Sequence, residues 1–299
     1  MRSRTIDLDG PVHFADFGGS GPPMVLVHGL GGCHVNWMAV GPALATRARV
    51  VAPDLAGFGR TPLAGRSASV EANQRLLDRF LDAVADEPAI LVGNSMGGLI
   101  AMMEAAHDPA KVERLVLVGP AQPRPPARSL DPMVALAFAT YAVPGLGETL
   151  LRWRAARLGP EGTVRHSLAL CCADAASLSP DIVVGHVTMA VERQAMPWVH
   201  AAFIEAARSL MAVTGRRSRL RALIAAIQAP TLLVQGTQDR LVPLAASRAT
   251  AALRPDWSFA VFDGIGHVPQ LEAPDRFVET VTSWLDAEER DTRAARGVR

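Results

Sequence analysis

Residues 89–98 read Ala89-Ile90-Leu91-Val92-Gly93-Asn94-Ser95-Met96-Gly97-Gly98. The apolar run predicts a buried strand, and the Gly-x-Ser-x-Gly that follows predicts a sharp turn into a helix, the arrangement known as a nucleophile elbow. Only small neighbours fit around so strained a serine backbone. The strain exposes the Ser95 hydroxyl beyond the strand, and the first amides of the helix point toward any developing negative charge. Ser95 is therefore a candidate nucleophile.

Length and composition indicate an ordinary globular protein. The chain has 299 residues, of which 49% are hydrophobic and 20% are charged, enough for one large core. The formal net charge is +1 and no basic stripe is present, so nothing indicates a nucleic-acid partner. The N-terminus has no apolar signal-peptide stretch, and the apolar segment Met133–Val143 is too short to span a bilayer. We expect a cytoplasmic protein with no stable membrane insertion.

The three cysteines, Cys33, Cys171 and Cys172, do not form the framework of a secreted disulfide protein. None of them has the spacing of a metal ligand, and unpaired buried thiols are expected instead. The sequence therefore predicts no metal and no cofactor, and it leaves the oligomeric state open.

Short Val/Leu/Ile runs alternate with helical stretches, which predicts an α/β fold with a mostly parallel, eight-stranded sheet covered by helices on both faces. The first two strands are expected to form an antiparallel hairpin. The expected strands are Thr5–Leu8, His13–Phe17, Met24–Val27, Val50–Ala52, Ala89–Val92, Leu115–Val118, Thr231–Gln235 and Phe259–Phe262. Helices are expected over 69–85, after Ser95 and around 277–285, and the charged tail beyond Glu288 is expected to fray.

Residues 121–225 interrupt this alternation. They open with the proline-rich stretch 121–126 and then show helical periodicity without convincing strands. We predict that 121–225 form a helical cap, inserted into a core made of 1–120 and 226–299. The helical stretches are Pro132–Ala142, Leu146–Leu158, Asp181–Gln194, Trp198–Ala212 and Leu220–Ile227. Most apolar cap residues, among them Met133, Leu136 and Trp153, are expected in the core, and some must face the site.

A serine hydroxyl needs a base, and the base needs a partner that orients it. Asp239 and His267 each follow an expected strand, so both lie at the edge of the sheet where Ser95 lies. His267 would take the Ser95 proton and later return it to the leaving group, while Asp239 holds the imidazole in the correct tautomer. Asp263 is the nearest rival of Asp239 for this role.

The loop after the third strand reads His28-Gly29-Leu30-Gly31-Gly32. The glycines of this loop let its backbone approach a substrate closely. We expect the oxyanion hole to consist of the Leu30 amide from this loop and the amide of Met96, the residue after the nucleophile. His28 is expected to brace the loop. The expected pocket residues are Gly29, His34, Trp37, Tyr141 and Val268. For His34 and Trp37, helix packing is an equal alternative.

These motifs together resemble those of the α/β-hydrolase-fold serine hydrolases, over residues 5–286. The resemblance rests on the His28-Gly29 loop, Asp54–Thr61, Gly93–Gly97, Gly236–Asp239 and Gly266-His267. It implies an enzyme of the esterase or lipase type with a helical cap. The leading hypothesis is hydrolysis of a small-molecule carboxylic ester with an apolar acyl or aryl group, through an acyl-Ser95 intermediate.

Two alternatives remain. Cofactor-free carbon–carbon bond hydrolases of the meta-cleavage type have a similar serine motif and a helical lid. They usually carry a Gly-Gly-Gly-Pro-Gly loop and a tryptophan after the catalytic histidine, where this chain has Gly29–Gly32 and Val268. A non-catalytic binding protein on the same fold is less favoured, because such proteins usually lose a member of the triad and this chain has all three.

Overall fold

The computed structural model describes residues 1–123 and 131–297. Its centre is one eight-stranded sheet with the order β1-β2-β4-β3-β5-β6-β7-β8. β2 pairs antiparallel with β1 and with β4, and all other neighbours are parallel. The strands are β1 Arg2–Asp7, β2 Pro11–Gly18, β3 Pro23–Val27, β4 Arg49–Pro53, β5 Ala89–Asn94, β6 Val112–Val118, β7 Thr231–Gly236 and β8 Ser258–Phe262. The predicted fold class and the N-terminal hairpin are confirmed.

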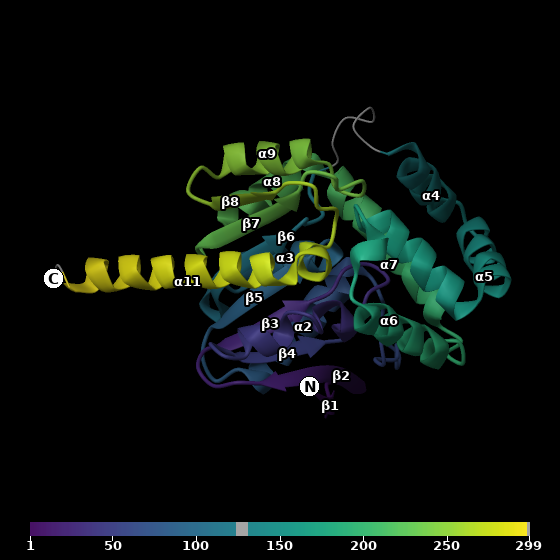
Figure 1. The fold of residues 1–299 in the computed structure, drawn as a ribbon, viewed down its shortest axis with the longest axis horizontal. Coiled ribbons are helices and arrows are strands. Elements are labelled where there is room, and N and C mark those ends of the chain that lie inside the picture. Colours follow the sequence, from purple (N-terminus) through teal and green to yellow (C-terminus); the bar gives the residue numbers. More distant parts are fainter. Residues whose placement is uncertain (124–130, 298–299) are drawn as a thin grey trace.

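The central strands β3, β5 and β7 are buried along their whole length, because helices cover both faces of the sheet. Successive side chains of a strand point to opposite faces. In β5, Leu91 packs in one buried cluster with α2 (Val70–Val84) and α3 (Met96–His107). Ile90 and Val92 pack in another with α11 (Pro274–Gly297). Figure 1 shows α11 crossing one face of the sheet, with α2 and α3 behind it.

Between β6 and β7, the described residues form helices and no strand. These helices are α4 (Pro132–Ala142), α5 (Leu146–Cys171), α6 (Pro180–Arg193), α7 (Val199–Gly215) and α8 (Arg217–Ala226). Helices α4 to α7 lie together at one side of the sheet, on the right in Figure 1. The boundaries of a cap at 121 and 225 stay a prediction. Leu220 and Ile224 of α8 share a buried cluster with strand residues, so this helix also packs as part of the core.

Three details differ from the sequence predictions. Helix α5 continues to Cys171 rather than ending at Leu158, across a break at Gly159, whose φ of 66° is not helical. Helix α11 continues to Gly297, so the expectation of fraying beyond Glu288 is wrong. Met133, Leu136 and Trp153 are 68%, 59% and 59% exposed, so they are not core residues. Residues 124–126 of the proline-rich stretch lie outside the described part of the chain.

The described helices include no single one that is both long and apolar enough to cross a membrane. The bent pair α4 and α5, which meet at 119°, passes that test together, by length and composition alone.

Three shorter helices complete the described fold. The short α1 (Gly41–Leu44) and α10 (Pro269–Glu272) flank longer elements, and α9 (Leu244–Leu253) follows β7.

All three cysteines are free thiols, with Cys33 and Cys172 buried and Cys171 half-buried. Burial raises the pKa of the Cys33 and Cys171 thiols to about 12, so neither is a thiolate at neutral pH.

Candidate active site

Ser95 stands between the end of β5 and the start of α3, in a strained backbone conformation with φ 56° and ψ −118°. The elbow needs its glycines because the chain is crowded there. A Cβ on Gly97 would lie 2.2 Å from the Val27 carbonyl oxygen, and one on Gly93 would lie 2.5 Å from the Gly97 oxygen. The Ser95 amide donates a 3.0 Å hydrogen bond to Val118 of β6, which fixes the turn to the next strand.

His267 and Asp239 form a buried pair, with 2.7 Å between Nδ1 of the imidazole and Oδ2 of the carboxylate. Asp239 Oδ2 also accepts from Gln235 Nε2 at 2.8 Å, and its Oδ1 accepts from the amides of Leu241 and Val242 at 2.9 and 2.8 Å. These bonds hold the carboxylate in place. Because Nδ1 is engaged, Nε2 is the ring nitrogen left for proton transfer.

Asp263, the rival for this role, lies elsewhere: its carboxylate accepts from the Thr237 hydroxyl at 3.1 Å. The acidic partner of His267 is therefore Asp239. Sequence reasoning did not single out Gln235, although its position at the end of β7, four residues before Asp239, was a usable signal.

The backbone of His267 is tied directly to the elbow. Asn94, the residue before Ser95, donates from Nδ2 to the Val118 carbonyl at 2.9 Å and to the His267 carbonyl at 3.2 Å. The His267 amide donates to the carbonyl of Cys171, at the end of α5, at 2.7 Å. The histidine is thus held between the serine turn on one side and a helix of the β6–β7 segment on the other.

Gly119 explains why the pair fits so closely against β6. Its φ is +48°, and a Cβ there would lie 3.1 Å from both Asp239 Oδ2 and His267 Nδ1. A larger residue would push the pair away from the strand ends.

The glycine loop after β3 lies against Ser95. A Cβ on Gly29 would come within 3.0 Å of the serine Cβ. His28 braces this loop as expected, because its Nδ1 donates to the Gly29 carbonyl at 2.8 Å and its Nε2 accepts from the Leu55 amide at 3.0 Å. Burial lowers the pKa of His28 to about 4, so the ring stays neutral. The oxyanion donors Leu30 and Met96 stay a prediction.

Ser95 and His267 line the same cavity, of about 930 Å³. The wall combines the glycine loop, the elbow and residues of α4 to α7, and it is mostly apolar. Of the expected pocket residues, Gly29, Tyr141 and Val268 are in the wall, and so is Leu30, the expected oxyanion donor. Sequence reasoning missed two polar wall residues on α6, His186 and Arg193, because helical periodicity does not show which face of α6 meets the cavity.

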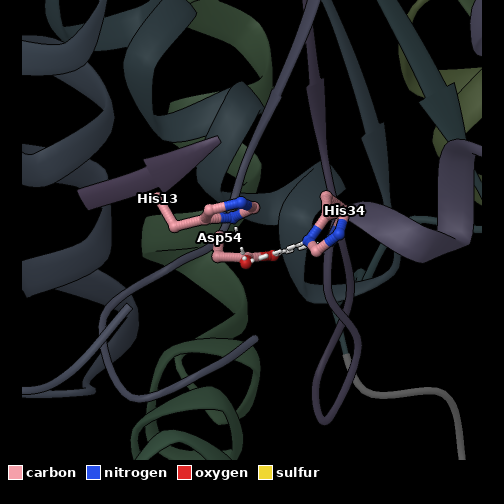
Figure 2. Close-up of side chains that lie close together, drawn as sticks. All are labelled: His13, His34 and Asp54. Carbon is pink, nitrogen blue, oxygen red and sulfur yellow. Dashed lines mark hydrogen bonds and ion pairs between the residues drawn. The ribbon is translucent and has the colours of Figure 1, made fainter. Parts of the chain in front are cut away.

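His34 and Trp37 do not line the cavity, so the prediction that they do is wrong. Both lie on a one-turn 3-10 helix, His34–Trp37, in which His34, Val35 and Trp37 are buried. Trp37 is fully buried in the cluster on the α11 face of the sheet. His34 points to Asp54, with Nδ1 at 3.0 Å from the carboxylate, as Figure 2 shows.

Asp54 is the centre of a second buried polar cluster, in which the rings of His13 and His34 flank one carboxylate (Figure 2). His13 Nδ1 lies 2.8 Å from Oδ2, and the amides of His34 and Arg60 donate at 2.7 and 2.9 Å. Burial by itself would raise the pKa of Asp54, but the hydrogen bonds from both histidines hold it well below its ordinary value. The possible ligand atoms of these three side chains lie within 4.8 Å of one another. Their hydrogen bonds satisfy the carboxylate, which fits a structural brace between β2, β4 and the loop after β3.

Comparisons with known proteins agree with this geometry. A family model described as alpha/beta hydrolase fold matches residues 22–274. A pimeloyl-(acyl-carrier protein) methyl ester esterase of Aromatoleum aromaticum is 32% identical over 256 residues, covering 85% of this chain and 94% of that protein. A 2-hydroxymuconate semialdehyde hydrolase of Pseudomonas sp. (strain CF600) is 31% identical over 282 residues, covering 89% of this chain and 88% of that protein.

Among solved structures, a putative lipase of Acinetobacter baumannii superimposes with a TM-score of 0.78 over 97% of this chain and 92% of its own. At 22% identity, that likeness concerns the fold alone. The two relatives cover most of the chain, and the family match includes the serine turn and the His267 loop. The chain belongs to the alpha/beta hydrolase fold family.

Proposed function

We propose that this protein is a serine hydrolase that cleaves carboxylic esters with apolar acyl or aryl groups. The observation that carries the proposal is the buried His267–Asp239 pair, 2.7 Å apart, whose histidine lines the same cavity as a serine held in a strained strand-to-helix turn. The mostly apolar wall supports an apolar substrate, because a ligand bound in the cavity is surrounded mainly by apolar side chains.

The proposed reaction uses Ser95, His267 and Asp239 in two steps, acylation and deacylation. His267 Nε2 takes the proton of Ser95 Oγ as the oxygen attacks the ester carbonyl, and the amides of Met96 and Leu30 stabilise the oxyanion that forms. The imidazolium then protonates the departing alkoxide, which leaves as the alcohol, and the acyl group stays on Ser95. A water molecule, deprotonated by His267, then attacks the carbonyl of the acyl-serine. The bond between the acyl group and Ser95 Oγ breaks, the imidazolium returns the proton to Oγ, and the acid is released. Asp239 stabilises the imidazolium in both steps.

A second candidate function is hydrolysis of a carbon–carbon bond, because one relative at 31% identity is a 2-hydroxymuconate semialdehyde hydrolase. The relatives by themselves do not separate the two reactions, since the pimeloyl-(acyl-carrier protein) methyl ester esterase is equally similar. A spectroscopic assay with a ring-fission dienoate, run beside an ester panel, separates them. Turnover of the dienoate but of no ester would replace the ester proposal.

The ester proposal is tested with p-nitrophenyl esters of increasing acyl length and the variant Ser95→Ala. We expect kcat/KM to fall by at least about 10⁴-fold, because the nucleophile is lost. Ser218→Ala is the matched control, since Ser218 is exposed on α8 and does not line the cavity. Unchanged activity of Ser95→Ala would refute the assignment. A fluorophosphonate that labels the wild type and not Ser95→Ala supports it independently, whereas failure to label the wild type would favour a binding protein.

A further inference from the structure

The loop that carries His267 is held from two sides. On one side lies the serine turn, where Asn94, the residue before Ser95, donates to the His267 carbonyl at 3.2 Å. On the other side lies the end of helix α5, where the Cys171 carbonyl accepts from the His267 amide at 2.7 Å. The position of the imidazole relative to Ser95 therefore depends on where the end of α5 lies.

The backbones of this loop and of the residues that end α5 are in close contact. A Cβ on Gly266 would lie 2.5 Å from the Cys171 carbonyl oxygen and 2.7 Å from the Ala173 amide nitrogen. Cys171 and Leu168 of the same helix line the cavity that Ser95 also lines. The end of α5 is thus both a part of the cavity wall and a support of the histidine loop.

Glu272, the last residue of α10, bonds to both of these segments. Its Oε1 accepts from the Gly266 amide at 2.9 Å, and its Oε2 accepts from the Ala173 amide at 2.7 Å. One carboxylate can hold two amides because it has two acceptor oxygens, and its charge strengthens each bond. Among the described residues, Asn94 and Glu272 are the two side chains that bond to the backbone of Gly266 and His267.

Glu272 itself is half-buried and is not among the residues that line the cavity, so it does not touch a substrate there. Burial raises the pKa of its carboxyl group, and the bonds from the Ala173 and Gly266 amides oppose that rise. Any effect of Glu272 on a reaction passes through the backbone that carries His267. A displacement of about 1 Å at a reacting group can lower a rate by about 100-fold, so that backbone must be held closely.

We propose that Glu272 is a positioning residue: by joining the Gly266 and Ala173 amides, its carboxylate holds His267 where the imidazole can take the Ser95 proton. The inference rests on the proposed function, because it assigns Glu272 a part in the same reaction. Without this bridge, the histidine loop is free to move away from the end of α5. The imidazole then moves with the loop, away from its partners Ser95 and Asp239.

The first test is turnover per active site in Glu272→Gln. The glutamine fills the same space, but its amide nitrogen cannot accept from a backbone N–H, so one of the two bonds is lost. Labelling with a fluorophosphonate, carried to completion, counts the sites; impaired folding lowers this count and leaves kcat per site unchanged. We expect kcat per site for a p-nitrophenyl ester to fall by about 10- to 100-fold, the range of one charged hydrogen bond, while KM changes by less than about threefold.

Two further variants make the result specific. Glu279→Gln is the matched control, because it makes the same chemical change at an exposed position on α11 and should keep the wild-type kcat per site. Glu272→Asp keeps the charge but is one methylene too short to span both amides, so its kcat per site should also fall, by at least about tenfold. Wild-type kcat per site in Glu272→Gln would overturn the proposal. Wild-type kcat per site in Glu272→Asp would also overturn it, because the charge and not the bridge would then matter.

Measurements without turnover separate this proposal from the proposed function. By NMR, hydrogen exchange of the Gly266 and Ala173 amides should be faster in Glu272→Gln than in wild type or Glu279→Gln. The downfield proton signal of His267 Nδ1–H, assigned by its change in Asp239→Asn, should shift or broaden in Glu272→Gln.

Both changes together support the bridge even where the wild type hydrolyses no ester. An unchanged His267 signal in Glu272→Gln would overturn the positioning role, and ester hydrolysis by the wild type would then leave the proposed function intact.

Discussion

The protein contains two buried histidine–aspartate arrangements that look alike in local chemistry and differ in surroundings. In one, His267 Nδ1 lies 2.7 Å from Asp239. In the other, the Nδ1 atoms of His13 and His34 lie 2.8 and 3.0 Å from Asp54. All five side chains are buried, and in both cases backbone amides donate to the carboxylate as well.

The two arrangements differ in what surrounds the side of each imidazole ring that points away from the carboxylate. His267 lines a cavity that Ser95 also lines, so its Nε2 is available to a reacting group. His13 and His34 do not line it, and His13 Nε2 is already 2.7 Å from the Ser3 hydroxyl. In the mechanism that we propose, the histidine–aspartate pair at the cavity carries a proton, whereas the cluster around Asp54 is a structural brace, and access to the cavity accounts for the difference.

The largest effect that would break this comparison is expected for Asp239→Asn. The amide occupies the same space but favours the wrong tautomer of His267, so kcat should fall by about 10⁴-fold. Ester turnover under saturating substrate measures it. Asp263→Asn is the matched control, because Asp263 lies in the His267 loop and contacts Thr237 instead. If Asp239→Asn keeps kcat within tenfold of wild type, Asp239 is not the orienting group.

The next largest effect is expected at the cluster of His13, His34 and Asp54. Asp54→Asn should lower the free energy of unfolding by about 3–5 kcal/mol, because it removes one partner of a fully buried charged cluster. Its folded fraction should retain most of the wild-type kcat, since Asp54 does not touch the cavity. Denaturant unfolding and active-site titration measure the two quantities. Asp86→Asn, at an exposed position, should change neither. A full loss of kcat at wild-type stability would show that the Asp54 cluster takes part in the reaction.

The smallest effect is expected at Glu104, a buried carboxyl group that has no histidine partner and so extends the comparison. Glu104 on α3 accepts from Gln74 at 2.7 Å through Oε2, and its Oε1 has no partner among the described residues. Burial raises its pKa to about 7. The folded state therefore holds a proton that the unfolded state releases, so this group destabilises the fold as pH rises from about 4.5 through 7, by up to about 3 kcal/mol.

Glu104→Gln removes that proton equilibrium. We expect the variant to be more stable than wild type at pH 8.5 and to differ little at pH 4.5, as measured by urea unfolding at both values. An identical change with pH in the two proteins would show that Glu104 is ionised in the folded state at neutral pH.

Much of the fold and of the candidate site was readable because it depends on local patterns and on sheet topology. The apolar runs predict the strands, and Gly93–Gly98 predicts the turn at Ser95. Asp239 and His267 follow their strands directly, so a parallel sheet brings them to the serine edge whatever the rest of the chain does. The helix α5 was predicted too short because Gly159-Pro160 resembles a helix end, although proline is well tolerated in the first turn of the helical segment that follows.

Other features depend on how the elements pack. His34 and Trp37 lie in a single turn, too short for any periodicity to show that one faces Asp54 and the other the core. Met133, Leu136 and Trp153 are apolar at helical spacing, yet no described element covers them.

The amino-acid sequence by itself determined the order of strands and helices, the strained serine and the loops that carry its partners, because backbone propensity and strand polarity are local properties. Only the tertiary structure decided which histidine reaches the cavity, which aspartate is a brace, and that Arg193 of α6 lines the cavity. Those outcomes depend on the rotation and docking of whole elements, which many small contacts between distant residues settle together.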